Sequence, residues 1–106
     1  MRRGEIYLAV LPDPVGRRPV LLVSRTAAID VRTTVTVAPV TRTLRGIASE
    51  VRLGRSHGLR AGSIANCDSL QTIPKAALRR RPVGSLTVEE LPALDRALRY
   101  ALGIRA

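Results

Sequence analysis

A chain of 106 residues is long enough for one domain with a modest core, and its 45% apolar content is typical of a globular protein. Eighteen basic residues against eight acidic ones give a formal net charge of +10, and every base except Lys75 is an arginine. This charge favours a polyanionic partner, nucleic acid first and an acidic protein second, because guanidinium groups form forked contacts with phosphate. With Cys67 as the single cysteine, a disulfide framework and a thiolate metal cluster are excluded. The sequence shows no signal peptide and no membrane-spanning run, so we expect a single cytoplasmic domain, residues 1–106.

The first two-thirds of the chain predict a series of short β-strands. Apolar runs and a Thr–Val alternation are separated by turn-forming Pro and Gly residues. The predicted strands are residues 5–11, 19–24, 34–40, 49–53, 63–67 and 70–73. Their core must be aliphatic, because Tyr7 and Tyr100 are the only aromatic residues.

The last third changes to a helical pattern. Residues 75–81 predict a short helical turn. Thr87 and Glu90 have the spacing of a capping box, and the apolar residues that follow recur at helical spacing up to Gly103, a natural helix end. Pro92 conflicts with a helix that starts at this box, so either the helix begins later or its first turn is distorted.

Short strands followed by one helix predict a mainly β protein, a small and strongly bent sheet or half-open barrel with a C-terminal helix. A chain of this length leaves sheet edges uncovered. Dimerisation is a common way to cover them, and we expect a homodimer.

The usual catalytic side-chain combinations are missing from the sequence. His57 is the only histidine, which excludes a two-histidine mechanism, and its surroundings indicate a loop residue. Glu89 and Glu90 indicate a solvated helix face rather than a metal site. No carboxylate cluster or phosphate-binding glycine loop is present, and Cys67 is expected to be buried and inert. A nuclease built from this chain would need no metal or other cofactor.

RNA can be cut without a metal, because its own 2′-hydroxyl serves as the nucleophile. The protein then has to position the 2′-oxygen, neutralise charge on the phosphoryl oxygens and protonate the leaving 5′-oxygen. An arginine can neutralise the charge on the phosphoryl oxygens, and a nearby hydroxyl can donate a hydrogen bond. Such a site needs an Arg and a Ser or Thr at strand ends that face one groove.

Two strand ends meet that need. Arg17 and Arg18 lead into the strand at 19–24, and Thr41 closes the strand at 34–40. Antiparallel neighbours bring the start of one strand near the end of the next, so Arg18 and Thr41 could meet. The alternative from spacing alone is that these are ordinary polar residues flanking strands.

Five blocks also carry a resemblance to a known family, in chain order and at matching spacing. They are residues 3–7 (RGEIY), 18–24 (RPVLLVS), 37–41 (VAPVT), 62–73 (GSIANCDSLQTI) and 84–86 (GSL), the last followed by a helix to Gly103. In these blocks the chain resembles the MazF/PemK endoribonuclease toxins of type II toxin–antitoxin systems. Each block is unspecific by itself, but the ordered set covers nearly the whole chain.

The resemblance implies an SH3-like small barrel of the CcdB/MazF/PemK type with a C-terminal helix, usually as a homodimer. It implies metal-independent, sequence-specific cleavage of single-stranded RNA that leaves a 2′,3′-cyclic phosphate and a 5′-hydroxyl. Arg18 and Thr41 fall on the family's usual catalytic pair. Arginine is a poor base, since its pKa is above about 12, so Arg18 is assigned to transition-state stabilisation and the general base stays open. The resemblance also implies an acidic antitoxin as a protein partner.

The expected RNA-binding residues lie around these blocks: Arg3, Arg17, Arg42, Arg45, Asp68 and Ser69. Solvated arginines and a turn-forming aspartate are the alternatives. The basic run at 79–81 is expected to be a solvated face that adds non-specific attraction. The chain departs from many relatives in two places: the loop at 12–17 is short, and Asp68 is followed by Ser rather than Gln or Asn.

Two other functions remain on the same fold. A CcdB-type gyrase poison relies on a C-terminal Trp-Gly-Ile sequence, and this chain has no Trp. A plain RNA-binding module would use Arg18 and Thr41 for affinity and leave the RNA intact.

Overall fold

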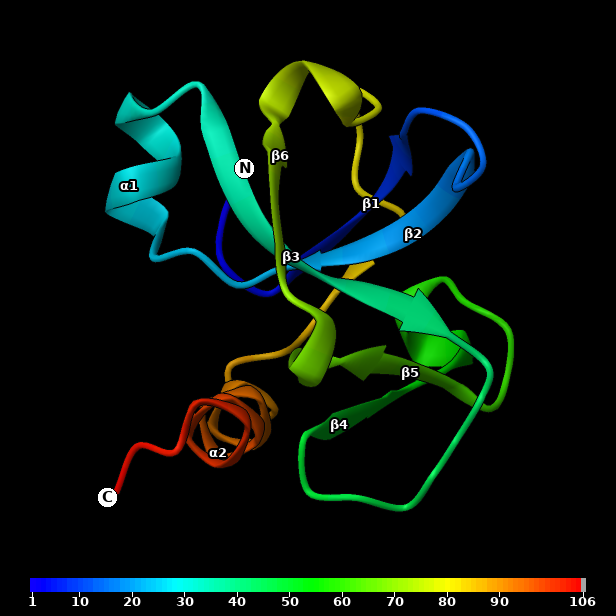
Figure 1. The fold of residues 1–106 in the computed structure, drawn as a ribbon, viewed down its shortest axis with the longest axis vertical. Helices are drawn as coiled ribbons and strands as arrows, with labels where there is room; N and C mark the ends of the chain where they lie inside the picture. The colour runs from blue at the N-terminus through cyan, green and yellow to red at the C-terminus, as the bar shows by residue number, and fades with distance from the viewer. Residues whose placement is uncertain (106) are drawn as a thin grey trace.

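Seven antiparallel strands form one strongly bent sheet in the computed structural model, which describes residues 1–105 (Figure 1). The strand order is β4-β5-β3-β2-β1-β7, and β6 pairs with β3 beside this path. The strands are β1 (Glu5–Val10), β2 (Arg17–Leu22), β3 (Thr34–Thr41), β4 (Glu50–Leu53), β5 (Ser63–Asn66), β6 (Gln71–Pro74) and β7 (Gly84–Ser85). The helices are α1 (Thr26–Val31) and α2 (Leu91–Leu102), with short 3-10 turns η1 (Arg55–His57), η2 (Cys67–Ser69) and η3 (Lys75–Ala77). This confirms the predicted bent sheet with a C-terminal helix.

Strand β3 is central to the sheet, because it pairs with β2 along one edge and with both β6 and β5 along the other. Its first half pairs with β6, from Thr34 opposite Pro74 to Val37 opposite Gln71. Its end pairs with β5. The two ladders meet around Pro39, which has no N–H to donate to a partner strand. The sheet bends at this change of partner, which separates β6 from β4 and β5 in Figure 1.

Both faces of the bent sheet bury apolar side chains, and the alternation within β2 shows how. Val20 and Leu22 point to one face and pack with Ile29 of α1, while Leu21 points to the other and packs with Leu94 of α2. Each of these side chains is almost completely buried. The two cores are aliphatic apart from Tyr7 and Cys67, as the sequence predicts. A strand covered on both faces is a continuous apolar run.

Helix α2 begins at Leu91, later than the capping box at Thr87 suggests. The Glu90 carboxylate accepts a hydrogen bond of 2.8 Å from the backbone N–H of Thr87, which is one half of the predicted box. Pro92 lies in the first turn, where its missing N–H has no helical acceptor to lose. The later start therefore resolves the conflict over Pro92. None of the helices described in residues 1–105 is long and apolar enough to cross a membrane.

Four local features differ from the sequence prediction. The two-residue strand β7, which pairs with β1, was not expected. Helix α1 was not expected, because six residues are too few to show a helical period. The helical turn predicted at 75–81 ends at Ala77, after which Leu78 bridges to Ala9 and the Arg79 N–H donates to the Leu8 carbonyl. This segment therefore ends its helical turn early because its backbone pairs with β1 instead. Strand β2 begins two residues early, at Arg17, because β1 supplies partners as far as Val10.

Candidate functional site

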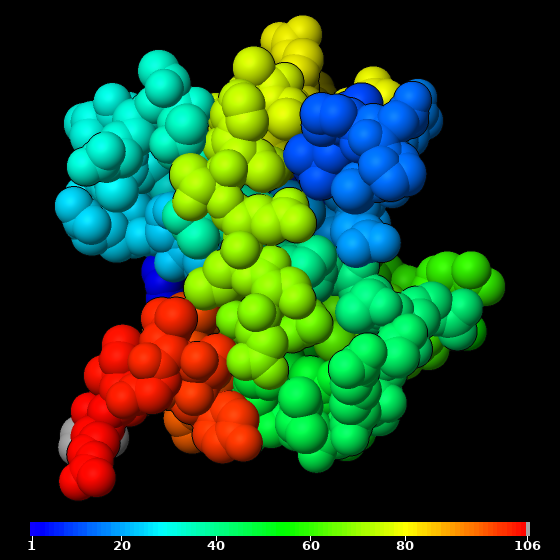
Figure 2. Space-filling model, viewed as in Figure 1, coloured from blue at the N-terminus to red at the C-terminus, as the bar shows by residue number. Residues whose placement is uncertain are grey.

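A hollow of about 340 Å³ lies where β2 begins and β3 ends. It is lined by Arg18, Pro39, Thr41, Thr43, Arg45, Glu50, Asn66, Ser69 and Gln71. In Figure 2 the surface is indented between the β1–β2 hairpin (blue) and the segment that follows β3 (green). Five strands contribute to this hollow, so its shape depends on the bend of the sheet.

The β2–β3 register brings the two predicted catalytic residues to this hollow. Val20 and Pro39 form the last pair of the β2–β3 ladder, and Arg18 and Thr41 each lie two residues beyond it on their strands. Side chains two residues apart lie on the same face of a strand, so Arg18 and Thr41 share a face. Both line the hollow.

The Arg18 side chain is exposed and forms no hydrogen bond or ion pair within residues 1–105. Thr41 is half-buried, and its Oγ1 accepts a hydrogen bond of 3.1 Å from the Thr43 N–H. The Thr41 hydroxyl proton therefore stays available for a bound group. The pair offers a fixed positive charge beside a hydroxyl donor.

Glu50 is the one acidic residue among those that line the hollow, and sequence reasoning did not find it. Its carboxylate accepts backbone N–H groups of the loop after β3, from Arg45 at 3.0 Å, Gly46 at 2.9 Å and Ile47 at 3.3 Å. These bonds hold the loop that carries Arg45 against the hollow. No sequence pattern indicates this role, since all three donors are main-chain groups.

Asp68 and Ser69, both predicted as RNA contacts, are neighbours in the η2 turn but contact different parts of the protein. The Asn66 side chain accepts from the Asp68 N–H at 2.9 Å and donates to the Ser69 hydroxyl at 3.3 Å, and both Asn66 and Ser69 line the hollow. The Asp68 carboxylate instead accepts a 2.5 Å hydrogen bond from the buried Ser49 hydroxyl. Asp68 thus anchors the turn, and Ser69 faces the site.

The other predicted RNA contacts differ in whether they line this hollow. Arg45 lines it, whereas Arg17 is exposed at the start of β2 outside the lining. The Arg42 guanidinium reaches the Ala61 carbonyl at 3.5 Å and lines a neighbouring hollow. Arg3 lies elsewhere, in a 2.6 Å ion pair with Asp95 of α2 and a hydrogen bond to the Val23 carbonyl.

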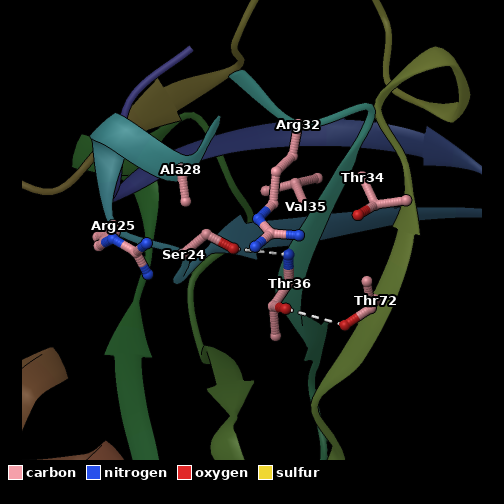
Figure 3. A pocket seen from close by; sticks show the side chains of 8 residues that line it. All are labelled: Ser24, Arg25, Ala28, Arg32, Thr34, Val35, Thr36 and Thr72. Atoms are coloured by element: carbon pink, nitrogen blue, oxygen red, sulfur yellow. Dashed lines mark hydrogen bonds between the residues drawn. The ribbon is translucent and has the colours of Figure 1, made fainter. Parts of the chain in front are cut away.

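A second hollow, of about 320 Å³, lies between α1, β3 and β6 (Figure 3). Three of its hydroxyl groups are used within the protein: the Ser24 hydroxyl accepts from the Thr36 N–H at 2.8 Å, and the Thr36 and Thr72 hydroxyls are 2.9 Å apart. Figure 3 shows the Arg32 guanidinium lying over Thr36. These hydrogen bonds join the segment before α1 to β3, and β3 to β6. The Arg18 hollow, which holds the predicted pair Arg18 and Thr41, is the stronger candidate for chemistry.

His57, predicted to be a loop residue, ends the short 3-10 turn η1 and is buried. It is 5% exposed, its Nδ1 accepts from the Gly54 N–H at 3.1 Å, and its Nε2 lies 3.0 Å from a Glu90 oxygen. Hydrogen bonds from the Thr87 backbone and from His57 lower the pKa of Glu90 below its usual value. Both glutamates precede α2 instead of lying on a helix face: Glu89 is exposed, and the partly exposed Glu90 is held by His57 and the Thr87 N–H.

Cys67 is buried as expected, and the loss of hydration together with the nearby Asp68 charge raises the pKa of its thiol to about 11. A thiol in that state is a weak nucleophile at neutral pH. Among residues 1–105 there is no group of three or more His, Cys, Asp or Glu side chains placed to share a metal ion.

Comparison with known proteins gives consistent matches over almost the whole chain. The family described as the PemK-like, MazF-like toxin of type II toxin–antitoxin systems matches residues 2–102. The endoribonuclease MazF3 of Mycobacterium tuberculosis is 41% identical over 87 residues, which is 82% of this chain and 84% of that protein. The solved structure of the M. tuberculosis toxin MazF-mt6 superposes with a TM-score of 0.87 at 38% identity, covering 96% of this chain and 99% of the other. A mycobacterial endoribonuclease in complex with its cognate antitoxin superposes with a TM-score of 0.86 at 28% identity, covering 100% and 98%. These superpositions agree with the SH3-like barrel expected from the sequence.

Proposed function

The chain belongs to the PemK-like, MazF-like toxin family of type II toxin–antitoxin systems, and from this premise we propose that it is a metal-independent endoribonuclease that cuts single-stranded RNA at defined sequences. Its M. tuberculosis relative MazF3 is named an endoribonuclease. The observation that carries the proposal is the hollow in which Arg18, with no acidic partner among the described residues, lies beside the Thr41 hydroxyl.

The proposed reaction uses the RNA itself as the nucleophile. The 2′-oxygen loses its proton and bonds to phosphorus, the bond from phosphorus to the 5′-oxygen breaks, and the 5′-oxygen gains a proton. The products are a 2′,3′-cyclic phosphate and a 5′-hydroxyl. Arg18 stabilises the negative charge that builds up on the phosphoryl oxygens, and the Thr41 hydroxyl donates a hydrogen bond to the same group. We assign no residue as the base that takes the 2′-proton.

RNA-binding roles follow from position. Arg45 and Ser69 line the reaction hollow, and Arg17 and Arg42 flank it at the ends of β2 and β3. These residues would position the phosphate backbone or contact bases. Arg3 and Asp68, also predicted as RNA contacts, would first have to release Asp95 and Ser49.

We propose an acidic antitoxin as the protein partner. A related mycobacterial endoribonuclease is known in complex with its cognate antitoxin, and the net charge of +10 suits an acidic segment that competes with RNA. We further propose a single toxin domain over residues 1–106 that acts as a homodimer in the cytoplasm.

The test is incubation of the purified protein with a long single-stranded RNA in EDTA, beside Arg18→Ala and a matched Arg99→Ala control on α2. We expect discrete fragments from the wild type and from Arg99→Ala, and intact RNA with Arg18→Ala. Mapping of the fragment ends then gives the cut sequence and the 2′,3′-cyclic phosphate. Intact RNA in every lane, with RNA or gyrase bound but unchanged, would favour a non-catalytic binder instead.

A further inference from the structure

We propose that Arg42, Arg55 and Arg60 form a second phosphate-binding site, which holds RNA nucleotides that flank the cut bond on one side. The inference rests on the proposed endoribonuclease function and extends it beyond the Arg18 hollow. Arg55 and Arg60 have no counterpart among the residues that the sequence pattern indicated.

The three arginines surround one hollow of about 380 Å³ beside the end of β3. Its lining consists of Arg42, Arg55, Gly58, Leu59, Arg60 and Ala61, so the side-chain charges there are all positive. A concave surface that carries cations of one sign attracts a polyanion and raises its local concentration. Guanidinium groups also match the geometry of phosphate oxygens.

The backbone that carries these side chains is well fixed. The Gly58 N–H donates to the Arg55 carbonyl at 3.1 Å, and the Ser63 hydroxyl donates to the Arg60 carbonyl at 2.7 Å. Between them, His57 is buried and bonded to Glu90, the residue before α2. Arg55 and Arg60 therefore extend from a rigid base, which lowers the entropy lost when they bind an anion.

No acidic side chain compensates the three charges within the part of the chain described here. The ion pairs in residues 1–105 involve the N-terminal amine, Arg3 and His57, and none involves these arginines. Arg42 makes one long hydrogen bond to the Ala61 carbonyl, while Arg55 and Arg60 make no side-chain hydrogen bond to the described residues. Three like charges around one hollow repel each other until an anion lies between them.

The hollow adjoins the reaction site. Thr41 lines the Arg18 hollow and Arg42, the next residue, lines this one. Strand β3 ends at Thr41, so the two hollows adjoin where the chain leaves the strand. RNA with its reactive phosphate at Thr41 can pass round this end toward Arg55. Phosphate binding is independent of base sequence, so the site would add affinity and fix the position of the RNA without choosing its bases.

The test compares wild type with Arg55→Gln/Arg60→Gln, which removes two exposed charges and leaves Arg42 in place. Three RNAs share one cut sequence: a minimal one, one extended at the 5′ side and one extended at the 3′ side. Copies with a 2′-deoxyribose at the cut nucleotide allow binding to be measured without cleavage. We expect the variant to cut the minimal RNA at the wild-type rate, and to bind one of the extended RNAs several-fold more weakly. For that RNA, the slope of log K against log salt should fall by roughly 0.7 for each phosphate that the variant no longer neutralises.

A charge-matched control is Arg96→Gln/Arg99→Gln on α2, because neither arginine lines the Arg18 hollow or the Arg55 hollow. The proposal is overturned if both double variants weaken binding to all three RNAs alike, because the effect is then overall charge. Unchanged binding of both extended RNAs by Arg55→Gln/Arg60→Gln overturns it as well. A wild type that leaves the minimal RNA uncut is a separate result, which contradicts the proposed function.

Discussion

Arg18 and Thr41 line one hollow, each two residues beyond Val20 and Pro39, the last pair of the β2–β3 ladder. Strand pairing, rather than loop conformation, therefore brings them together. A site built on paired strands holds its groups more firmly than one built on loops, and firm positioning is the main requirement of a reaction whose nucleophile the RNA supplies.

Two replacements of Arg18 distinguish the effect of its positive charge from that of its planar, forked guanidinium group. Arg18→Ala is expected to lower kcat by roughly 10²–10³-fold, the usual effect of losing one transition-state donor. Arg18→Lys keeps the charge but loses the planar fork, so its kcat should fall between that of Ala and wild type. Single-turnover cleavage of a labelled RNA measures both variants. Equal rates for Lys and wild type would show that point charge alone is enough.

The Thr41 hydroxyl can be tested by its removal at constant shape. Thr41→Val is expected to slow cleavage by about 10-fold or more, since one hydrogen bond to the reacting group is worth on the order of 1.4 kcal/mol or more. Thr41→Ser keeps the hydroxyl and should stay within a few-fold of wild type. Thermal unfolding of both variants serves as the control for folding. A Val variant as active as Ser would remove Thr41 from the reaction.

Glu50 is expected to act as a positioning residue through the loop that carries Arg45. Glu50→Ala removes the acceptor of the Arg45 and Gly46 N–H groups, so KM should rise more than kcat falls, and those amides should exchange hydrogen faster. Glu50→Gln keeps one acceptor oxygen and removes the charge, so it should bind RNA at least as tightly as wild type. If Glu50→Gln lost as much activity as Glu50→Ala, the negative charge of Glu50 would instead take part in the reaction.

Close packing between β7 and η1 predicts a stability effect at Gly84. A Cβ atom there would lie 1.9 Å from the His57 carbonyl oxygen, so Gly84→Ala should lower the free energy of unfolding by more than about 2 kcal/mol. Gly54→Ala is the matched control, because a Cβ at Gly54 meets nothing within 4 Å. Urea unfolding of the two variants measures the difference. Similar midpoints would contradict the observed packing.

Stability should depend on pH through Glu90. Its pKa is lowered in the folded protein by the hydrogen bonds from the Thr87 backbone and from His57. A carboxyl whose folded pKa is lowered stabilises the fold above its unfolded pKa of about 4.3, and this contribution disappears as pH falls through the lowered value. Glu90→Gln should therefore be less stable than wild type at pH 6, with a difference that narrows toward pH 3. A difference that stays constant with pH would assign the effect to packing.

Strand positions, the C-terminal helix and the Arg18–Thr41 pairing could be predicted from the sequence, because each depends on local periodicity or on neighbouring strands. Glu50 could not, since its partners are main-chain N–H groups that any sequence would supply. His57 could not either, because its burial depends on Glu90 far along the chain. Helix α1 is held by packing of Ile29 on the sheet rather than by a recognisable helical pattern.

The bonds from Glu50 to main-chain N–H groups also leave the loop after β3 free to vary in sequence. Its shape depends on one carboxylate and on Gly46, whose φ of +73° favours glycine, and not on the side chains of Arg45 or Ile47. Those side chains can be exchanged over evolutionary time while the loop keeps its path beside Thr41. A toxin with this arrangement could change which RNA it recognises without rebuilding the strands that carry the proposed catalytic pair.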